Sequence, residues 1–249
     1  MKEEIAALLN VPNGLTVEMV NAVLAVGREN AIPALRALIL ESDDKLTVRA
    51  ASVLALIDGG DVVSVLIELM EIGVQKKDPL LMELCIGSLA RRGQTIVEPC
   101  LEAVKKTEVP MLRCAIADAL SQSGSKDERI FELLVALLPE FAMTAAGGLA
   151  DFGDARALPA LRTFLDSVHK GVRPPYAHEI FYVTSAIETL GGALNRKDVQ
   201  LLKRAERGSL SQPRRRGREA PARNDLCWCG SGVKFKKCCM RSAQAEAAA

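Results

Sequence analysis

The feature that most constrains the fold of this chain is a repeat with a period near 32 residues. Glycines close six apolar runs, at Gly27, Gly60, Gly93, Gly124, Gly153 and Gly191. The residue five positions before each glycine is small: Ala22, Ala55, Ser88, Ala119, Gly148 and Ala186. The residue four positions before it is aliphatic: Val23, Leu56, Leu89, Leu120, Leu149 and Ile187. A fixed period of this length is typical of solenoid proteins, in which each repeat contacts only its neighbours.

Each repeat is predicted to be a pair of antiparallel helices. Segments such as LTVRAASVLALIDGG place apolar residues at helical spacing. The glycine ends the first helix because it adopts the left-handed conformation without strain. Pro33, Pro99 and Pro159 lie six residues after three of the glycines and fit the first turn of a second helix. The small residues five positions before each glycine, called the small column below, would let helices approach closely. The aliphatic residues four positions before each glycine would fill the space between the helices.

Composition agrees with helices. Aromatic residues make up only 4% of the 249 residues, whereas strands favour aromatic and β-branched side chains. The pattern, with Arg49 and Arg113 both eleven residues before their glycines, resembles the HEAT and HEAT-like repeat family over residues 15–206. The resemblance implies an all-α fold, a HEAT-like α-solenoid of about six helical pairs over residues 1–206. The stretch HKGVRPPYAHE interrupts the pattern and is expected to be an exposed loop.

Charge is distributed unevenly along the chain. Residues 1–202 hold 20 basic and 27 acidic residues, whereas residues 203–241 hold 12 basic and 3 acidic ones. Residues 207–222 have no apolar period and are predicted to form a flexible basic linker, with a disordered tail at 242–249. The linker carries four arginines: Arg214, Arg215, Arg216 and Arg218. They could contact nucleic acid or only keep the linker solvated, and an excess of positive charge favours anionic partners.

Four of the seven cysteines lie close together near the end of the chain, at Cys227, Cys229, Cys238 and Cys239. A segment this short cannot form a hydrophobic core, so a stable fold needs a cross-link such as a disulfide or a bound metal ion. Four thiolates suit a tetrahedral Zn²⁺ ion, and Lys234, Lys236 and Lys237 could offset its excess negative charge. A disulfide pair or free thiols are the alternative. Zinc is favoured over them because a reducing compartment disfavours disulfides and adjacent cysteines bond poorly to each other.

The stretch RNDLCWCGSGVKFKKCCM closely resembles the SEC-C motif, which is best known at the C-terminus of the SecA translocase motor. The resemblance implies zinc binding by a motif over residues 223–241. In that motor the motif also contacts the chaperone SecB and ribosomes. Leu226 and Trp228 stand where proline is usual, Met240 where glycine is usual, and many members have histidine in place of Cys239. Partner identity therefore does not carry over.

Six residues of the motif join the linker arginines as candidate partner-binding residues: Arg223, Trp228, Lys234, Phe235, Lys236 and Lys237. The two rings could stack on exposed bases or could only cover the zinc centre.

No catalytic residues are predicted. Cys85, Cys100 and Cys114 lie on helical faces and are expected to be small buried hydrophobic residues. His178-Glu179 is a lone pair in a chain with two histidines, which is too few for the metal site of the HEAT-like iron hydroxylases. HEAT-like DNA glycosylases need a basic, aromatic-lined groove, whereas residues 1–202 are acidic and lack tryptophan. The sequence has no phosphate-binding GxxxxGK[ST] loop.

The N-terminal stretch has no signal-peptide pattern and the sequence has no long apolar span, so a cytoplasmic location is expected. The predicted function is a non-catalytic protein-binding adaptor or scaffold with two contact modules, the solenoid surface and a zinc-bound tail. The resemblance suggests chaperones or the translation and secretion machinery as partners, and no small-molecule substrate is inferred. One alternative is RNA or ribosome association through residues 203–241, and another is an enzyme with an unrecognised site.

Overall fold

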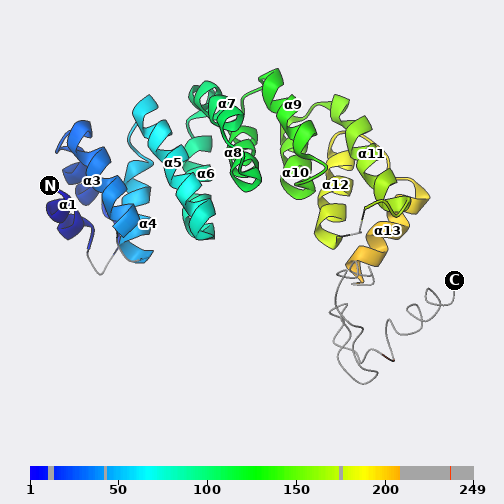
Figure 1. Cartoon of the computed structure of the whole chain (residues 1–249), viewed down its shortest axis with the longest axis horizontal. Coiled ribbons are helices and arrows are strands. Elements are labelled where there is room, and N and C mark those ends of the chain that lie inside the picture. The colour runs from blue at the N-terminus through cyan, green and yellow to red at the C-terminus, as the bar shows by residue number, and fades with distance from the viewer. Residues whose placement is uncertain (11–13, 42–43, 174–175, 208–235, 237–249) are drawn as a thin grey trace. The chain divides into compact units, whose positions relative to one another are not determined.

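The computed structural model describes residues 1–10, 14–41, 44–173, 176–207 and 236, and all the elements in these residues are helical (Figure 1). The elements are α1 (Lys2–Leu9), α2 (Val17–Leu24), α3 (Arg28–Glu41), α4 (Asp44–Leu54), α5 (Gly60–Lys76), α6 (Pro79–Ala90), η1 (Gly93–Ile96), α7 (Val97–Lys106), α8 (Pro110–Gln122), α9 (Glu128–Leu137), α10 (Ala142–Phe152), η2 (Ala155–Ala157), α11 (Leu158–His169), α12 (Ala177–Thr189) and α13 (Arg196–Glu206). The predicted all-α, HEAT-like solenoid class is confirmed.

The chain divides into two compact units, Met1–Phe152 and a second unit that begins at Gly153. The boundary falls inside the range 1–206, for which the sequence predicts one solenoid. The predicted linker apart from Arg207, the tail, and the zinc motif apart from Lys236 lie outside the described residues.

The first unit consists of two helical layers. The helices α4, α6, α8 and α10 lie side by side in one layer, called the inner layer below. The helices α3, α5, α7 and α9 cover this layer (Figure 1). Leu54, Leu89, Leu120 and Leu149, one from each helix of the inner layer, are fully buried. Burying one face of every helix against the next repeat supplies the apolar core that a single hairpin lacks.

Glycine ends the first helix of most repeats as predicted. The residues Gly27, Gly93, Gly124, Gly153 and Gly191 have φ between 59° and 86°, the region in which glycine is free of strain. The prediction for Gly60 is wrong, because Gly59 takes the positive φ of 124° and Gly60 is the first residue of α5. Since α4 already ends at Leu54, Leu56 lies in the following turn and is 58% exposed, and Ile57 is buried instead.

Two of the three predicted proline positions are confirmed. Pro99 and Pro159 lie in the first turns of α7 and α11, each of which follows a short 3₁₀ segment. Pro33 lies further inside α3, because that helix begins at Arg28, directly after Gly27. A proline at this depth cannot donate to the carbonyl of Glu29, which lies one helical turn earlier.

Polar contacts join neighbouring repeats of the first unit at their edges. Arg28 pairs with Asp61 and Arg36 with Glu68, and both pairs link α3 to α5. Ion pairs as exposed as these add little stability. Half-buried arginines contribute more to stability, because their guanidinium groups donate hydrogen bonds to the last carbonyls of a helix in the preceding repeat. Arg49 donates to the carbonyl of Leu9 across 2.7 Å.

In the second unit α12 packs against both α11 and α13. The insert that the sequence predicts as a loop is only partly irregular. Residues 170–173 form an exposed or half-buried turn, but Ala177, His178 and Glu179 already belong to α12. Arg173 holds the turn to α11, because its guanidinium lies 4.6 Å from the ring centroid of Phe164.

Candidate functional site

The predicted zinc ligands lie outside the described residues: Cys227, Cys229, Cys238 and Cys239. The same holds for the predicted partner-binding residues Arg214, Arg215, Arg216, Arg218, Arg223, Trp228, Lys234, Phe235 and Lys237. Lys236 is described and is half-buried. The donor set fits zinc by its chemistry, because four thiols complete a tetrahedral shell. Elsewhere, the residues that the structure describes contain no group of three or more His, Cys, Asp or Glu that could hold a metal ion.

The other three cysteines are buried, as predicted. Cys85, Cys100 and Cys114 are 1%, 0% and 6% exposed. Burial raises the pKa of the Cys85 and Cys100 thiols to about 12 and also raises the pKa of Cys114. Thiols with such pKa values stay protonated and are poor nucleophiles.

His178 and Glu179 belong to no group of three or more possible metal ligands among the residues that the structure describes. The ring of His178 stacks on Tyr176 with the centroids 6.3 Å apart, and His178 is exposed. Glu179 is half-buried and lies 3.8 Å from the Arg173 guanidinium. Burial raises the pKa of the Glu179 carboxyl, although the charge of Arg173 opposes this shift.

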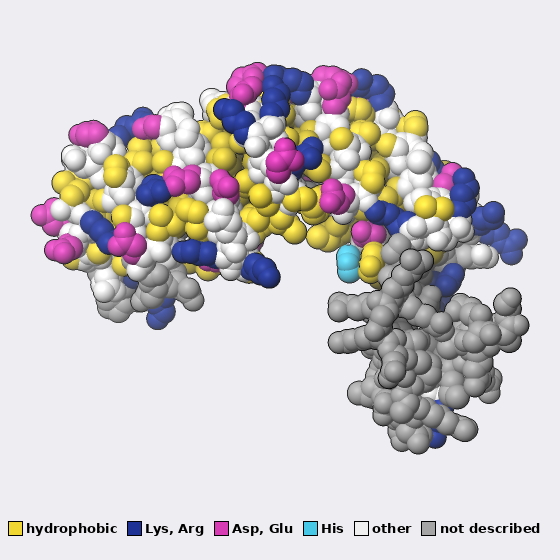
Figure 2. All heavy atoms as spheres, in the orientation of Figure 1, with side chains coloured by type: hydrophobic (Ala, Val, Ile, Leu, Met, Phe, Trp, Pro, Cys, Tyr) yellow, Lys and Arg dark blue, Asp and Glu magenta, His cyan; other side chains and the backbone are white. Residues whose placement is uncertain are grey.

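An exposed apolar row crosses the first unit. It consists of Leu80, Met111 and Met143, which are 44%, 47% and 43% exposed. Each is the second residue of an inner-layer helix, α6, α8 or α10. Because these helices lie side by side, the three side chains follow one another along one edge, and Figure 2 shows hydrophobic side chains at the lower edge below α8 and α10. Their spacing of 31 and 32 residues was a readable signal that the sequence analysis missed.

Mixed charges flank this apolar row. Lys76 and Lys77 precede α6, and Lys105 and Lys106 end α7. Glu102 pairs with both Lys105 and Lys106. Exposed carboxylates also lie in the loops before α8 and α10, at Glu108 and Glu140. An apolar strip with a polar rim is the usual composition of a protein–protein interface.

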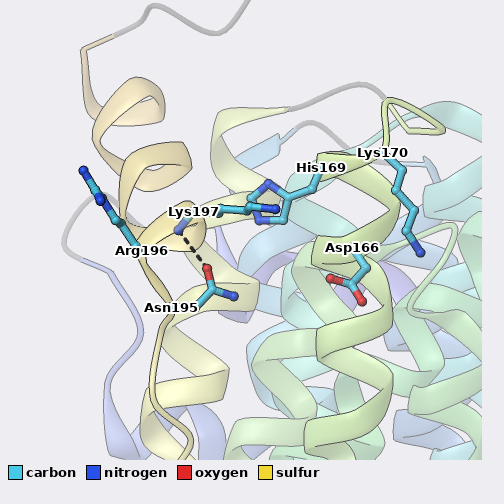
Figure 3. Close-up of a pocket in the computed structure, with 6 residues that line it drawn as sticks. All are labelled: Asp166, His169, Lys170, Asn195, Arg196 and Lys197. Atoms are coloured by element: carbon cyan, nitrogen blue, oxygen red, sulfur yellow. Dashed lines mark hydrogen bonds between the residues drawn. The ribbon is translucent and has the colours of Figure 1, made fainter.

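A hollow in the second unit lies between the end of α11 and the start of α13 (Figure 3). It is lined by Asp166, His169, Lys170, Asn195, Arg196 and Lys197 and has a volume of about 490 Å³. Lys197 extends toward α11, whereas Arg196 points away from it (Figure 3). Two amides in the first turn of α13 are occupied, because those of Lys197 and Asp198 donate to the Asn195 side chain at 2.8 and 3.0 Å.

A buried carboxylate, Asp198, joins the helices that flank this hollow. It is 1% exposed, and its oxygens lie 2.8 Å from His169 Nε2 and 2.6 Å from Arg162 Nη1. Burial raises the pKa of the Asp198 carboxyl, but hydrogen bonds from His169, the Asn195 amide and Arg162 outweigh burial and hold the pKa below its usual value. The contacts of the Asp198 carboxylate with His169, Asn195 and Arg162 therefore have a structural role, because they hold α11 and α13 together. No sequence motif connects His169 and Asp198, because they lie 29 positions apart.

The boundary between the units is also a boundary in charge. Residues 1–152 hold 14 basic and 22 acidic residues, whereas residues 153–207 hold 9 basic and 6 acidic ones. The charge counts along the sequence predict this change near residue 203. The second unit is therefore already basic before the predicted linker begins.

Comparison with protein families finds matches in two segments. The SEC-C motif model matches residues 223–241, and the model of the PBS lyase HEAT-like repeat matches residues 142–167. The second match covers α10, η2 and most of α11, and therefore runs across the boundary between the two units at Gly153.

A search of curated proteins finds no match to the chain. Among the described helices, none combines the length and the apolar character needed to cross a membrane. Both family resemblances inferred from the sequence are confirmed: the chain contains a HEAT-like repeat and, at residues 223–241, a SEC-C motif.

Proposed function

We propose that this protein is a non-catalytic adaptor with two contact modules. The first unit binds a protein segment, and the SEC-C motif binds zinc through Cys227, Cys229, Cys238 and Cys239 and makes a second contact. The observation that carries the proposal is the exposed row of Leu80, Met111 and Met143, which places one large apolar side chain on each of three successive repeats.

The spacing of the row suits a helical partner. Neighbouring packed helices lie roughly 8–10 Å apart, so the three side chains recur at about that interval. A partner helix rises about 10.5 Å over seven residues. An amphipathic helix with one apolar residue in every seven, laid across α6, α8 and α10, would therefore meet all three side chains.

The second module acts through its tether. A linker of 16 residues, 207–222, would span on the order of 20–25 Å if it behaves as a flexible chain. Two weak contacts on one chain raise the overall affinity through effective concentration, provided that the linker reaches both sites on the partner. Zinc supplies the fold of a segment too short for its own apolar core.

The test is quantitative affinity capture followed by reconstitution with each purified candidate partner. Met111→Lys should weaken the partner's affinity at least tenfold, because it places a charge in the middle of the apolar strip. Leu56→Lys is the matched control, since Leu56 is 58% exposed in the turn after α4, whereas the row lies at the first turns of its helices. If no partner discriminates between the two variants, the row is not the contact surface.

RNA association is a second candidate function, favoured by the basic composition of residues 153–207 and of the tail that follows. It assigns phosphate contacts to residues 203–241, including the four linker arginines. Binding would then weaken steeply as salt rises from about 50 to about 200 mM. No binding at the lower salt concentration would count against this candidate.

A further inference from the structure

A half-buried carboxylate, Asp118, lies on α8 in the middle of the inner layer. It follows Met111 of the apolar row by seven residues, so two helical turns bring both residues to nearly the same face, about 10.5 Å apart along the axis. Gln122, one turn further, donates to the Asp118 carboxylate across 2.9 Å. Among the described residues, neither Asp118 nor the neighbouring Asp151 of α10 forms an ion pair.

The charge of Asp118 costs the free protein stability. Burial raises the pKa of the Asp118 carboxyl and the charge of Asp151 raises it as well, although the hydrogen bond from Gln122 opposes the shift. A carboxyl whose pKa is raised by folding destabilises the fold at neutral pH. The ammonium group of Lys126 is engaged with the backbone carbonyls of Asp151 and Phe152. Ionisable groups that cost stability and lack a charged partner are typical of functional sites.

Glycines flank Asp118 on both neighbouring helices. Gly87 on α6 and Gly147 on α10 lie six positions before the glycine that follows their helix, as Asp118 does, and the three helices lie side by side. No atom lies within 4 Å of a Cβ built on Gly87, and Gly147 is half-buried. The space beside the carboxylate is therefore open to the apolar stem of a long basic side chain.

We propose that this surface, formed by the apolar row and Asp118, selects a partner helix that carries a basic residue beside its apolar stripe. The apolar stripe contacts the row, and an arginine or lysine lies over the glycines and pairs with the Asp118 carboxylate. A helix with its side chains is about 10–12 Å wide, so one helix can reach from Met111 to Asp118. The inference rests on the proposed protein-binding function and names the chemistry of the partner.

The charges of the first unit argue against two other occupants. Phosphates of a nucleic acid would be repelled by Asp118 and Asp151 and by the excess of acidic residues in 1–152, 22 against 14 basic ones. The basic linker of the chain itself could pair with Asp118. However, residues 211–222 contain no Leu, Ile, Val, Met or aromatic residue that could cover the row. A basic amphipathic helix uses both the row and the carboxylate.

The experiment compares two fluorescein-labelled synthetic helical peptides by their anisotropy with the full chain, at about 150 mM salt to screen distant charges. Both peptides carry leucine at every seventh position, and one has arginines beside this stripe where the other has glutamines. The arginine peptide should bind roughly 5- to 30-fold more tightly. Asp118→Asn should remove this preference. Glu132→Gln, an exposed carboxylate on the outer helix α9, is the control and should keep it.

Stability of the free protein separates a binding role from a structural one. Asp118→Asn keeps an acceptor for Gln122 and removes the half-buried charge, so its resistance to urea at neutral pH should be unchanged or higher. Gly87→Leu fills the open space with a better helix former and should also reduce the preference for the arginine peptide. A loss of stability in Asp118→Asn would assign the carboxylate to the fold and overturn the inference.

The inference and the proposed function fail in different ways. If Met111→Lys weakens both peptides but Asp118→Asn leaves the preference for arginine intact, the row is the contact surface and Asp118 does not select the partner. If neither peptide binds, or if Met111→Lys has no effect, both are overturned. If replacing the four linker arginines by glutamine raises the affinity for the arginine peptide, the chain's own linker occupies the surface and replaces the proposed partner.

Discussion

The guanidinium of Arg92 donates to the carbonyl of Ile57 across 2.7 Å, over a separation of 35 residues. The same nitrogen lies 3.1 Å from the carbonyl of Ala55. One arginine of the third repeat thus closes the end of α4 in the preceding repeat, where the helix leaves carbonyls without intrahelical partners. Burial lowers the pKa of the Arg92 guanidinium, although Asp58 opposes this shift.

Removing this link should destabilise the first unit. Arg92→Met leaves half-buried carbonyls without a donor, and we expect the free energy of unfolding to fall by about 1–3 kcal/mol. Arg92→Lys should lose less, because it keeps the charge but cannot reach two carbonyls with a planar fork. Urea denaturation measures both variants. Arg91→Met is the control, since Arg91 is exposed, and a loss as large as that of Arg92→Met would contradict the assignment.

Two glycines inside helices should respond to alanine with opposite signs. A Cβ on Gly148 would lie 2.8 Å from Leu134 Cδ2 and 2.9 Å from Ser121 Cβ, so Gly148→Ala overpacks the contact of α10 with α8 and α9. The strain, typically about 1–3 kcal/mol, exceeds the gain of about 1 kcal/mol in helix propensity.

Gly87, inside α6, supplies the matched comparison. No atom lies within 4 Å of a Cβ built on Gly87, so Gly87→Ala should raise the free energy of unfolding by up to about 1 kcal/mol. Thermal and chemical denaturation of the two variants measure the difference. Equal changes in both would show that the small column has no role in helix approach.

The buried Asp198 should make the second unit sensitive to acid. Its pKa is held below the unfolded value of about 3.9, so its stabilising contribution is fully present above about pH 4. That contribution is lost as the pH falls through the lower pKa of the folded state. Asp198→Asn should reduce stability at neutral pH, because the donors at Arg162 and His169 lose their charged acceptor.

The measurement is urea denaturation from neutral pH down through and below the unfolded value of about 3.9, because the contribution is lost in that direction. Asp198→Asn should flatten the acid limb of the stability curve. Asp166→Asn is the control, because Asp166 is an exposed carboxylate of the same hollow. An unchanged acid limb in the Asp198 variant would show that the cluster does not govern acid sensitivity.

Metal content tests the proposed zinc centre directly. Protein kept reduced and never exposed to chelator should contain about one zinc per chain, as expected for a single site with four cysteine ligands. Replacing Cys238 and Cys239 together by serine should abolish it. The helical circular dichroism signal should stay the same, because the thirteen α-helices of the described chain all end by Glu206. Metal-free wild-type protein would exclude a zinc centre, and a collapse of the helical signal in the variant would contradict independent modules.

The repeat was legible in the sequence because its signals are local. A glycine ends a helix through its own φ, and the helical spacing of apolar residues depends only on the turns around it. Five of the six predicted glycines therefore take the expected conformation. The exception is Gly60, because the adjacent Gly59 takes the positive φ in its place. Only packing determines that Gly59 forms the turn and that Ile57, rather than Leu56, is buried in the core.

The sequence by itself determined an all-α repeat fold, and it predicts a zinc site at the cysteine cluster, because both inferences depend on residue types at short, regular spacing. Only the tertiary structure decided which apolar side chains remain uncovered and which charges meet. Leu80, Met111 and Met143 form a row because three helices from different repeats lie side by side. The spacing of 31 and 32 residues marks the three positions in the sequence, but whether their side chains are covered depends on what packs from distant segments.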